Sequence, residues 1–357
     1  MPDRINIIGE ISRMGGGQVY MRDIITSVRS FAKVSLTTDI TKDPLNILPL
    51  VNETIPVHYT YDESVGYLNE TFQIIKLKKY LKKIHLKDGI VINNHPNIFL
   101  KNGDLNILHG FSFLDFIIDE YGNINNKLLF RLIKLSNIYK IYDGGHFIAN
   151  STYTKDLSFK LFRKLGLKPS STNILFPTFH SSYKLSEKDR GVLSFQRINR
   201  GKKLDTILDV ARSSNLHFII AGAVNQGDQE YFKELIRNKP DNVDIISNPS
   251  EAEKENLYLN SKIFLHLNRK EHFGISIVES MSHGLVPVVP KTGGPWLDIV
   301  KEGRYGFGYS NLEEIPESLS LAIETTDMKR REIIESTKRF SYDNFSENLR
   351  HLIDSVE

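Results

Sequence analysis

Short runs of apolar, often β-branched residues alternate along this chain with segments whose apolar positions recur every three to four residues. Runs of the first kind are typical of buried strands, and segments of the second kind are typical of helices that cover a sheet. Regular alternation of the two predicts parallel sheets covered by helices, an α/β fold. In the first half, strands are expected at residues 5–8, 34–37, 57–61, 89–93, 106–109 and 146–150, and helices at 18–31, 68–85, 126–139 and 154–165.

The alternation is interrupted at 177–190, a polar stretch with no apolar periodicity, and then starts again. Such a stretch is typical of a linker between domains. Beyond it, strands are expected at 192–196, 217–221, 243–246, 263–267 and 286–289, and helices at 203–212, 229–237, 251–259, 275–283, 295–300, 312–325, 328–337 and 341–353. We therefore expect two doubly wound, Rossmann-like domains, 1–176 and 191–340, that face each other across a cleft at the carboxyl ends of their strands.

Length and composition narrow the class of protein. At 357 residues the chain suits two domains of roughly 150–180 residues each. It has 40% hydrophobic and 25% charged residues and no cysteine, which argues against a disordered chain and excludes disulfide and thiol chemistry. No apolar stretch approaches the roughly 18 residues that span a bilayer, and no signal-like leader opens the sequence. We expect a cytoplasmic protein, either soluble or peripheral on the membrane.

Charge is unevenly distributed, although the net charge is only +3. Residues 1–170 carry 22 Lys and Arg against 16 Asp and Glu, whereas the remainder carries 24 against 27. The basic half contains a lysine-rich amphipathic segment from Phe72 to His85 and a second basic and apolar segment at 126–142. Such segments favour contact with an anionic membrane surface. A helix that packs on the core and exposes a solvated lysine face has the same pattern.

Two carboxylates flank a Phe-Gly-Ile turn in the stretch E-H-F-G-I-S-I-V-E, which runs from Glu271 to Glu279. The turn lies between an expected strand and helix, so the amides of Phe273, Gly274 and Ile275 would be free donors for a phosphate or a sugar hydroxyl. A carboxylate can accept two hydroxyl hydrogen bonds at once, as a vicinal diol requires. Both residues could instead be surface glutamates around an ordinary helix. The Gly293-Gly294-Pro295 turn that follows favours a site.

A basic loop, F-Q-R-I-N-R-G-K-K, follows the first strand of the second half. Arg197 and Lys202 are the candidates there for binding a nucleoside diphosphate, whose charge grows as it leaves. Arg200 and Lys203 could take either role. A solvated basic loop without function is the alternative reading.

Two further features lie in the first half. Gly15, Gly16 and Gly17 form a turn between the first strand and helix that could hold a phosphate, although the spacing is not G-x-G-x-x-G and no P-loop is present. His109 ends a strand, where it could reach a bound sugar or could simply be structural. No D-x-D pair and no compact His/Asp/Glu cluster appears, so we expect no metal.

Together these motifs resemble the GT-B retaining glycosyltransferases of family 4, also called group 1. The pair Glu271 and Glu279 matches the family's E-x7-E, and Arg197 and Lys202 match its R-x4-K, with Lys203 where a glycine is usual. Within the family, H-F-G-I and G-G-P-W-L-D-I-V are most similar to the mannosyltransferases that extend lipid-linked oligosaccharides for asparagine-linked glycosylation.

The resemblance implies transfer of a hexose from a nucleoside-diphosphate sugar with retention and without a metal or other cofactor. GDP-mannose is the favoured donor and UDP-glucose the next, and the acceptor is a glycan or a polyprenyl-linked glycan, not a nucleic acid. It also implies that the last helix, 341–357, completes the first domain. The expected catalytic residues are Arg197, Lys202, Glu271 and His109, and the expected donor-binding residues are Gly15, Gly16, Gly17, Phe273, Gly274, Ile275, Val278, Glu279 and Gly294.

Three other functions fit the same pattern. A sugar-nucleotide 2-epimerase would convert the donor without an acceptor. A glycan phosphorylase would need inorganic phosphate and usually a pyridoxal cofactor. A non-catalytic nucleotide-binding protein would bind the diphosphate tightly without turnover.

Overall fold

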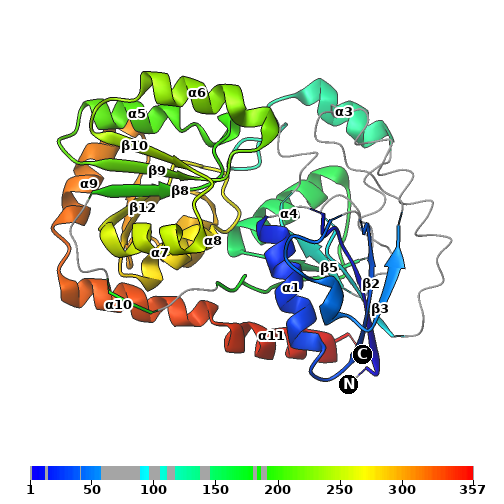
Figure 1. Cartoon of the computed structure of the whole chain (residues 1–357). Coiled ribbons are helices and arrows are strands. Elements are labelled where there is room, and N and C mark those ends of the chain that lie inside the picture. Colours follow the sequence, from blue (N-terminus) through cyan, green and yellow to red (C-terminus); the bar gives the residue numbers. More distant parts are fainter. Residues whose placement is uncertain are drawn as a thin grey trace. The chain divides into compact units, whose positions relative to one another are not determined.

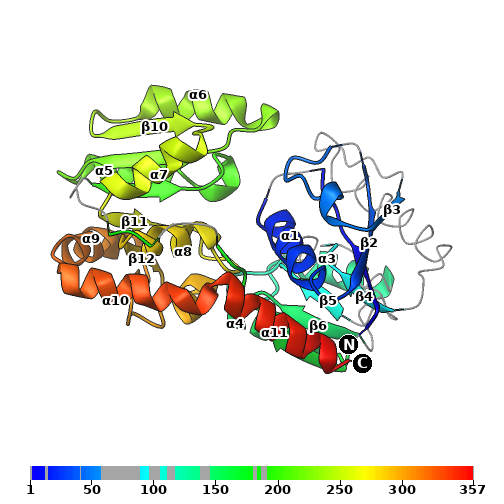
Figure 2. The same ribbon diagram turned by 60° about the horizontal axis from the view of Figure 1, so that its bottom comes forward.

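The computed structural model describes residues 2–12, 15–40, 42–57, 89–95, 105–110, 117–136, 145–179, 183–185 and 191–356. It divides into two compact units, the first made of Met1–Thr178 with Tyr342–Glu357 and the second of Phe179–Ser341. Each unit contains one parallel sheet covered by helices (Figures 1 and 2). The predicted segment 72–85 lies outside the described residues, and so does most of the expected linker 177–190.

The sheet of the first unit has the strand order β3-β2-β1-β4-β5-β6-β7, and every pair is parallel. The order reverses between β1 and β4, which makes their carboxyl ends the topological switch point where ligands bind in such sheets. The strands are β1 (Arg4–Ile8), β2 (Lys33–Thr38), β3 (Glu53–Pro56), β4 (Ile90–Asn93), β5 (Leu105–Leu108), β6 (His146–Ala149) and β7 (Ser171–Ile174). The helices are α1 (Gly16–Val28), α3 (Lys127–Ser136), α4 (Thr152–Leu165) and α11 (Tyr342–Asp354), with a short 3₁₀ turn at Leu48–Leu50.

The last helix of the chain belongs to the core of the first unit. Phe345, Leu349 and Ile353 of α11 are buried in the same apolar cluster as β1 and α1, and α11 lies beside α1 (Figures 1 and 2). Tyr20 of α1 meets Phe345 edge-on, with ring centroids 5.4 Å apart. The amphipathic period of α11 therefore supplies an apolar stripe that the first unit buries.

Two elements of the first unit differ from the sequence prediction. Strand β3 at Glu53–Pro56, which pairs with β2 from Ser35 to Thr38, was not predicted. Of the strand expected at 57–61, residues 58–61 lie outside the described residues. Because Glu53–Pro56 contains a charged residue and a proline, it has no strand-like apolar pattern. Proline is nevertheless tolerated in β3, which is an edge strand. The short polar strand β7 was not predicted at all, because Ser171–Ile174 lacks an apolar run.

The second unit has the strand order β10-β9-β8-β11-β12-β13, again parallel throughout and reversing between β8 and β11. Its strands are β8 (Val192–Phe195), β9 (Phe218–Gly222), β10 (Val243–Ser247), β11 (Ile263–Leu265), β12 (Val286–Pro290) and β13 (Phe307–Tyr309). Its α-helices are α5 (Asp205–Arg212), α6 (Gln229–Asn238), α7 (Glu251–Asn260), α8 (Ile275–Ser282), α9 (Ile315–Ile323) and α10 (Asp327–Thr337). Short 3₁₀ turns lie at Arg200–Lys202, Gln226–Asp228, Leu312–Glu314 and Lys338–Phe340, and a π-helical turn at Pro295–Ile299. The predicted fold class, two doubly wound α/β sheets, is confirmed.

Candidate active site

In the second unit, the candidate residues follow the two strands at which the sheet order reverses. Arg197 and Lys202 come after β8, and Glu271 comes after its neighbour β11. The two strands are parallel, so both loops leave the same edge of the sheet. This is the place where doubly wound sheets bind their ligands.

The basic side chains of the loop after β8 differ in whether they have a hydrogen-bond or ion-pair partner. Asn199 caps the 3₁₀ turn Arg200–Lys202 by accepting from the Lys202 amide, which orients that lysine. Arg200 donates to both carboxylate oxygens of Glu234, so its charge is used on α6. The exposed guanidinium of Arg197, by contrast, makes no hydrogen bond or ion pair with any described residue. Lys203 is also exposed and its side chain has no described partner, so Arg197 and Lys203 are both available to an anion.

Glu271 is held by three nitrogen atoms that surround one of its oxygens. Lys202 Nζ lies 3.0 Å from Oε2 and Asn268 Nδ2 lies 3.1 Å from it. His266 Nε2, in a side chain only 3% exposed, lies 3.5 Å from the same oxygen, close enough for charge interaction but without hydrogen-bond geometry. Oε1 accepts no hydrogen bond within the described part of the chain. Glu271 thus presents one engaged oxygen and one available oxygen.

The charge state of Glu271 follows from this arrangement. Burial alone would raise the pKa of the carboxyl, but Lys202 and His266 outweigh burial and hold the pKa well below its ordinary value. Glu271 is therefore ionised at neutral pH. An ionised carboxylate is a hydrogen-bond acceptor only, which suits it to binding hydroxyl groups.

The backbone around Glu271 is fixed by glycines. Gly294 donates its N–H to the Glu271 carbonyl at 2.9 Å, and a Cβ at this position would lie 2.0 Å from the His272 oxygen. Gly294 therefore allows its backbone to approach that of His272 closely. Its amide is bonded to Glu271 and is not open to a ligand. Gly274 has φ +102° at the N-cap of α8, a conformation that favours glycine. Behind it the amides of Ile275 and Ser276 donate to no described residue, as expected at a helix start.

Two of the expected donor-binding side chains lie in the core. Val278 is fully buried and its N–H is bonded to the Gly274 carbonyl, so it supports the loop from beneath and has no surface open to a ligand. Phe273 is 3% exposed and packs edge-on against Phe340. Only the backbone of Phe273 can serve the site.

Glu279 forms a second cluster on α8. Lys254 Nζ lies 3.0 Å from Oε1, and Tyr258 donates its hydroxyl to Oε2 at 3.1 Å. Burial, reinforced by Glu279, raises the pKa of Tyr258 well above its ordinary value, so the phenol keeps the proton that it donates. Each oxygen of Glu279 has one partner and can accept a second hydrogen bond. Binding of a diol by Glu279 stays a prediction.

In the first unit, Asn94 connects the glycine turn to His109. Asn94 Nδ2 donates to the Gly17 carbonyl at 3.2 Å, so its Oδ1 faces the other way and lies 2.9 Å from His109 Nε2. Because Oδ1 can only accept, Nε2 must carry the ring proton. Tyr20 packs edge-on against the imidazole, with centroids 5.1 Å apart. His109 thus has a defined orientation and tautomer.

The glycine turn itself has two parts. Gly15 precedes α1 in an extended conformation, and Gly16 and Gly17 open the helix with amides that bond to no described residue. A Cβ on Gly17 would make only ordinary contact with the His109 ring, at 3.7 Å. The free amides at this helix start are compatible with a phosphate, and that role stays a prediction.

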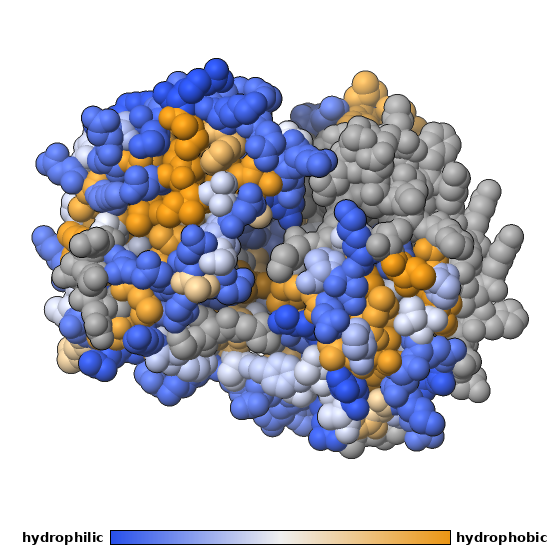
Figure 3. Space-filling model, in the orientation of Figure 1, coloured by the Kyte–Doolittle hydropathy of each residue, from blue (hydrophilic) through white to orange (hydrophobic). Residues whose placement is uncertain are grey.

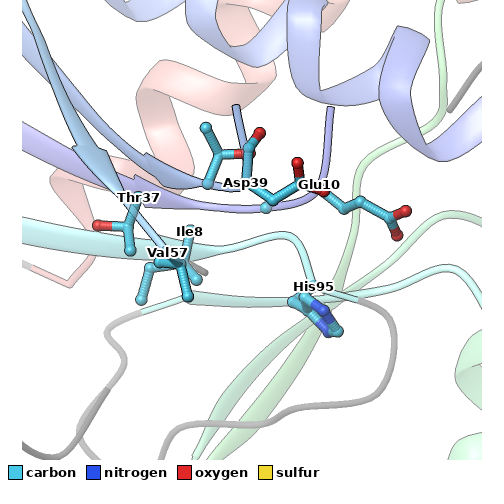
Figure 4. A pocket seen from close by; sticks show the side chains of 8 residues that line it. Ile8, Glu10, Thr37, Asp39, Val57 and His95 are labelled. Atoms are coloured by element: carbon cyan, nitrogen blue, oxygen red, sulfur yellow. The ribbon is translucent and has the colours of Figure 1, made fainter. Parts of the chain in front are cut away.

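A small pocket opens at the carboxyl ends of β1, β2 and β4 in the first unit. It is lined by Ile8, Gly9, Glu10, Thr37, Thr38, Asp39, Val57 and His95. Figure 4 shows Glu10 and His95 on one side of it and Thr37 and Val57 on the other. Its volume of about 20 Å³ has room for little more than one water molecule. The sequence analysis did not select these residues.

The structure thus brings some of the predicted residues into contact and shows further residues beside them that were not predicted. It brings Lys202 and Glu271 into contact, whereas it binds Glu279 to Lys254 and Tyr258 instead. Sequence reasoning missed His266, Asn268 and Asn94. A signal existed for all three, since each is a polar residue at or just beyond the end of a strand that lies at or next to the switch point.

The match to known proteins falls on the unit that carries the Lys202–Glu271 pair. Residues 176–340 match the family described as "Glycosyl transferases group 1". The second unit belongs to the group 1 glycosyltransferases. The predicted family is thereby confirmed. The E-x7-E pair, Glu271 and Glu279, and the R-x4-K pair, Arg197 and Lys202, all lie among the described residues of this unit.

Curated relatives of two kinds match part of the chain. The chain is 31% identical over 137 residues to the "GDP-Man:Man(3)GlcNAc(2)-PP-Dol alpha-1,2-mannosyltransferase" of Dictyostelium discoideum, which covers 36% of this chain and 27% of the relative. It is 32% identical over 150 residues to a glycogen synthase of Elusimicrobium minutum. That match covers 39% of this chain and 30% of the relative. The matched part thus spans less than a third of either relative.

Solved structures extend the likeness to the whole chain. Anabaena HepE in complex with UDP and glucose superposes with a TM-score of 0.68 at 17% identity, covering 99% of both chains. The sucrose-phosphate synthase of Thermosynechococcus elongatus gives 0.73 at 14% identity, also over 99% of both. At such identities the likeness shows the fold, and the predicted GT-B fold is confirmed.

The described residues contain no group of three or more His, Asp or Glu side chains placed to hold a metal ion. They also contain no helix long and apolar enough to cross a membrane.

Proposed function

We propose that this protein transfers a hexose from a nucleoside-diphosphate sugar to a glycan or lipid-linked glycan, with retention of the anomeric configuration. GDP-mannose is the favoured donor and UDP-glucose the next. The mannosyltransferases among the curated relatives support the first, and the glucose and UDP bound to the structural neighbour support the second.

One observation carries the proposal: three nitrogen atoms surround one oxygen of Glu271 and leave the other available. A carboxylate held in this way is a rigid acceptor for hydroxyl groups of the transferred sugar. The free amides at the start of α8 lie next to it and add donors for the same ligand. Glu271 would bind and orient the sugar, and no role as a general acid is needed.

Two cations of the loop after β8 would bind the diphosphate. Arg197, exposed and without a described partner, would bind the diphosphate bidentately. Lys202 would share its charge between Glu271 and the nearest phosphate oxygen, and so would join the sugar site to the leaving group. The leaving phosphate would serve as the base on the same face of the sugar, since no carboxylate nucleophile was identified from the sequence.

His109 would contact the transferred sugar. Its imidazole is oriented by Asn94, whose Oδ1 lies 2.9 Å from Nε2.

The experiment is a thermal-shift screen against GDP-mannose, UDP-glucose, UDP-GlcNAc and UDP-galactose. A ligand at 100 times its dissociation constant should stabilise the fold by about 2.7 kcal/mol, enough to rank the four. Arg197→Gln should abolish the shift, while Arg200→Gln, from the same loop but bound to Glu234, should keep it. If none of the four stabilises the wild type, the proposal is wrong.

A further inference from the structure

Two helices of the second unit, α7 and α8, share a polar cluster around Glu279. Spacings of four residues place Lys254 and Tyr258 on one face of α7, and Glu279 and His283 on one face of α8. Lys254 and Tyr258 each bond one oxygen of Glu279, at 3.0 and 3.1 Å. Hydrophilic side chains are visible over α7 in the space-filling view (Figure 3), whereas Tyr258 of the same helix is buried.

His283 is a fully buried histidine at the C-cap of α8. Its Nδ1 lies 3.0 Å from the carbonyl oxygen of Glu279, and its Nε2 lies 3.0 Å from Oε1 of Glu255 on α7. The hydroxyl of Ser282, which donates to the same Glu279 carbonyl, lies 3.3 Å from Nδ1. The imidazole therefore connects the end of α8 to α7, with one nitrogen directed at each helix.

The ring of His283 also stacks on the ring of Tyr258. The two centroids are 5.3 Å apart and the planes are inclined by 29°. Because Tyr258 donates its hydroxyl to Glu279, the contacts return to the residue at which they began. They run from the Glu279 carbonyl to His283, from His283 to Tyr258, and from Tyr258 to the Glu279 carboxylate.

A buried imidazole is a costly way to fill space. An apolar side chain would occupy the same volume without taking polar atoms out of water, which costs free energy unless those atoms are hydrogen-bonded. What the two nitrogens of His283 add is a fixed direction of the ring, set by Glu279 on one side and Glu255 on the other. The orientation of Tyr258 is fixed with it.

We infer that His283, with Glu255 as its anchor, is a positioning residue for the donor nucleotide. The pair fixes the Tyr258 ring, and the Tyr258 hydroxyl fixes the direction in which Glu279 presents its remaining lone pairs. A carboxylate held in this way distinguishes a ribose, which has two neighbouring hydroxyl groups, from a 2′-deoxyribose, which has one. The inference rests on the proposed function in one respect, that Glu279 accepts hydrogen bonds from the sugar diol of the donor nucleotide.

The experiment compares the dissociation constants of GDP and UDP with those of their 2′-deoxy forms, measured by titration calorimetry on the full chain. The wild type should bind the tighter ribonucleotide about tenfold or more better than its deoxy form, because a hydrogen bond to a charged group is lost. His283→Phe keeps a ring but has neither nitrogen, and it should remove most of this preference by weakening the ribonucleotide alone. His283→Asn, which keeps a donor for the Glu279 carbonyl, should restore part of it.

Glu255 gives a second test that does not alter a fully buried residue. Its side chain is 39% exposed, and Glu255→Ala should lower the ribose preference as His283→Phe does. In the double variant the two effects should not add, because each removes the same contact. The matched control is the exposed pair His217 and Asp244 of the same unit, also 3.0 Å apart. His217→Phe and Asp244→Ala should keep the ribose preference of the wild type.

Two results would overturn the inference. In the first, His283→Phe and Glu255→Ala weaken the ribonucleotide and its deoxy form equally, or weaken neither, so that the ribose preference is unchanged. In the second, the wild type itself shows no ribose preference. Sugar transfer is not measured here: a wild type that prefers ribose, loses the preference in both variants and yet releases no diphosphate from any sugar nucleotide would contradict the proposed transfer and support the inference.

Discussion

Lys202 and Glu271, 69 positions apart in the chain, form an ion pair with 3.0 Å between Nζ and Oε2. Each was expected to hold a different part of the donor, the lysine the diphosphate and the glutamate the sugar. Their contact means that a diphosphate bound by Lys202 shares that cation with Glu271. We therefore expect the two residues to act as one unit, so the effects of replacing them should not add.

Replacement Glu271→Gln should change how stability depends on pH. The folded pKa of Glu271 is held well below its ordinary value, so below the unfolded pKa of about 4.3 the unfolded chain binds more protons here than the native one. The stabilisation is complete above that pH and is lost as the pH falls through the folded pKa. Urea unfolding between pH 7 and pH 3 should show a steeper fall of the unfolding free energy for the wild type than for the variant.

His266 should control the ionisation of Glu271. The groups that face this carboxylate are Lys202, Asn268 and His266, and removal of the imidazole by His266→Phe leaves burial less well opposed. The acid limb of sugar-nucleotide binding against pH should therefore move to higher pH, and His266→Asn, which keeps a donor, should restore part of the shift. An acid limb at the same pH in all three proteins would show that His266 is only a packing residue.

Gly294 should tolerate no side chain. A Cβ there would lie 2.0 Å from the His272 carbonyl oxygen, so Gly294→Ala must displace the Glu271 loop and should lower the unfolding free energy by about 1–3 kcal/mol. Gly227→Ala is the control, since nothing lies within 4 Å of its Cβ. Equal stability of the two variants in urea would contradict this packing.

Lys203 should be a strained position that glycine relieves. It has φ +51° and ψ 45°, the left-handed conformation, and the related family usually has glycine here. Lys203→Gly should raise the unfolding free energy by roughly 0.5–1 kcal/mol, the left-handed strain of 1–2 kcal/mol less the entropy that glycine loses on folding. Lys203→Ala, which keeps the strain, should not. Stabilisation by alanine as large as by glycine would assign the effect to the lysine charge instead.

The sequence was a good guide where pattern and local chemistry agree. The strands β8 and β11 have apolar runs, and the loops that follow them were therefore placed correctly, with Arg197, Lys202 and Glu271 at the expected edge of the sheet. The strands β3 and β7 were missed because pairing with a neighbour, not an apolar run, makes them strands.

The site was harder to predict than the fold, because its contacts join residues far apart in the chain. The pattern marks Lys202 and Glu271 as charged, but only the order of β8 and β11 in the sheet brings them together. His266 was missed because it stands inside an apolar run, where a single histidine is usually structural. The membrane contact expected at 72–85 lies outside the described residues and stays a prediction.

The central claim is best tested by the release of nucleoside diphosphate from the four sugar nucleotides, measured by chromatography with and without a polyprenyl-linked glycan. The wild type should release the diphosphate from one of them, GDP-mannose first, and Glu271→Ala and Lys202→Ala should each lower the rate by about 100-fold or more. Arg200→Gln should leave the rate unchanged. A wild-type protein that neither binds nor turns over any of the four would contradict the account.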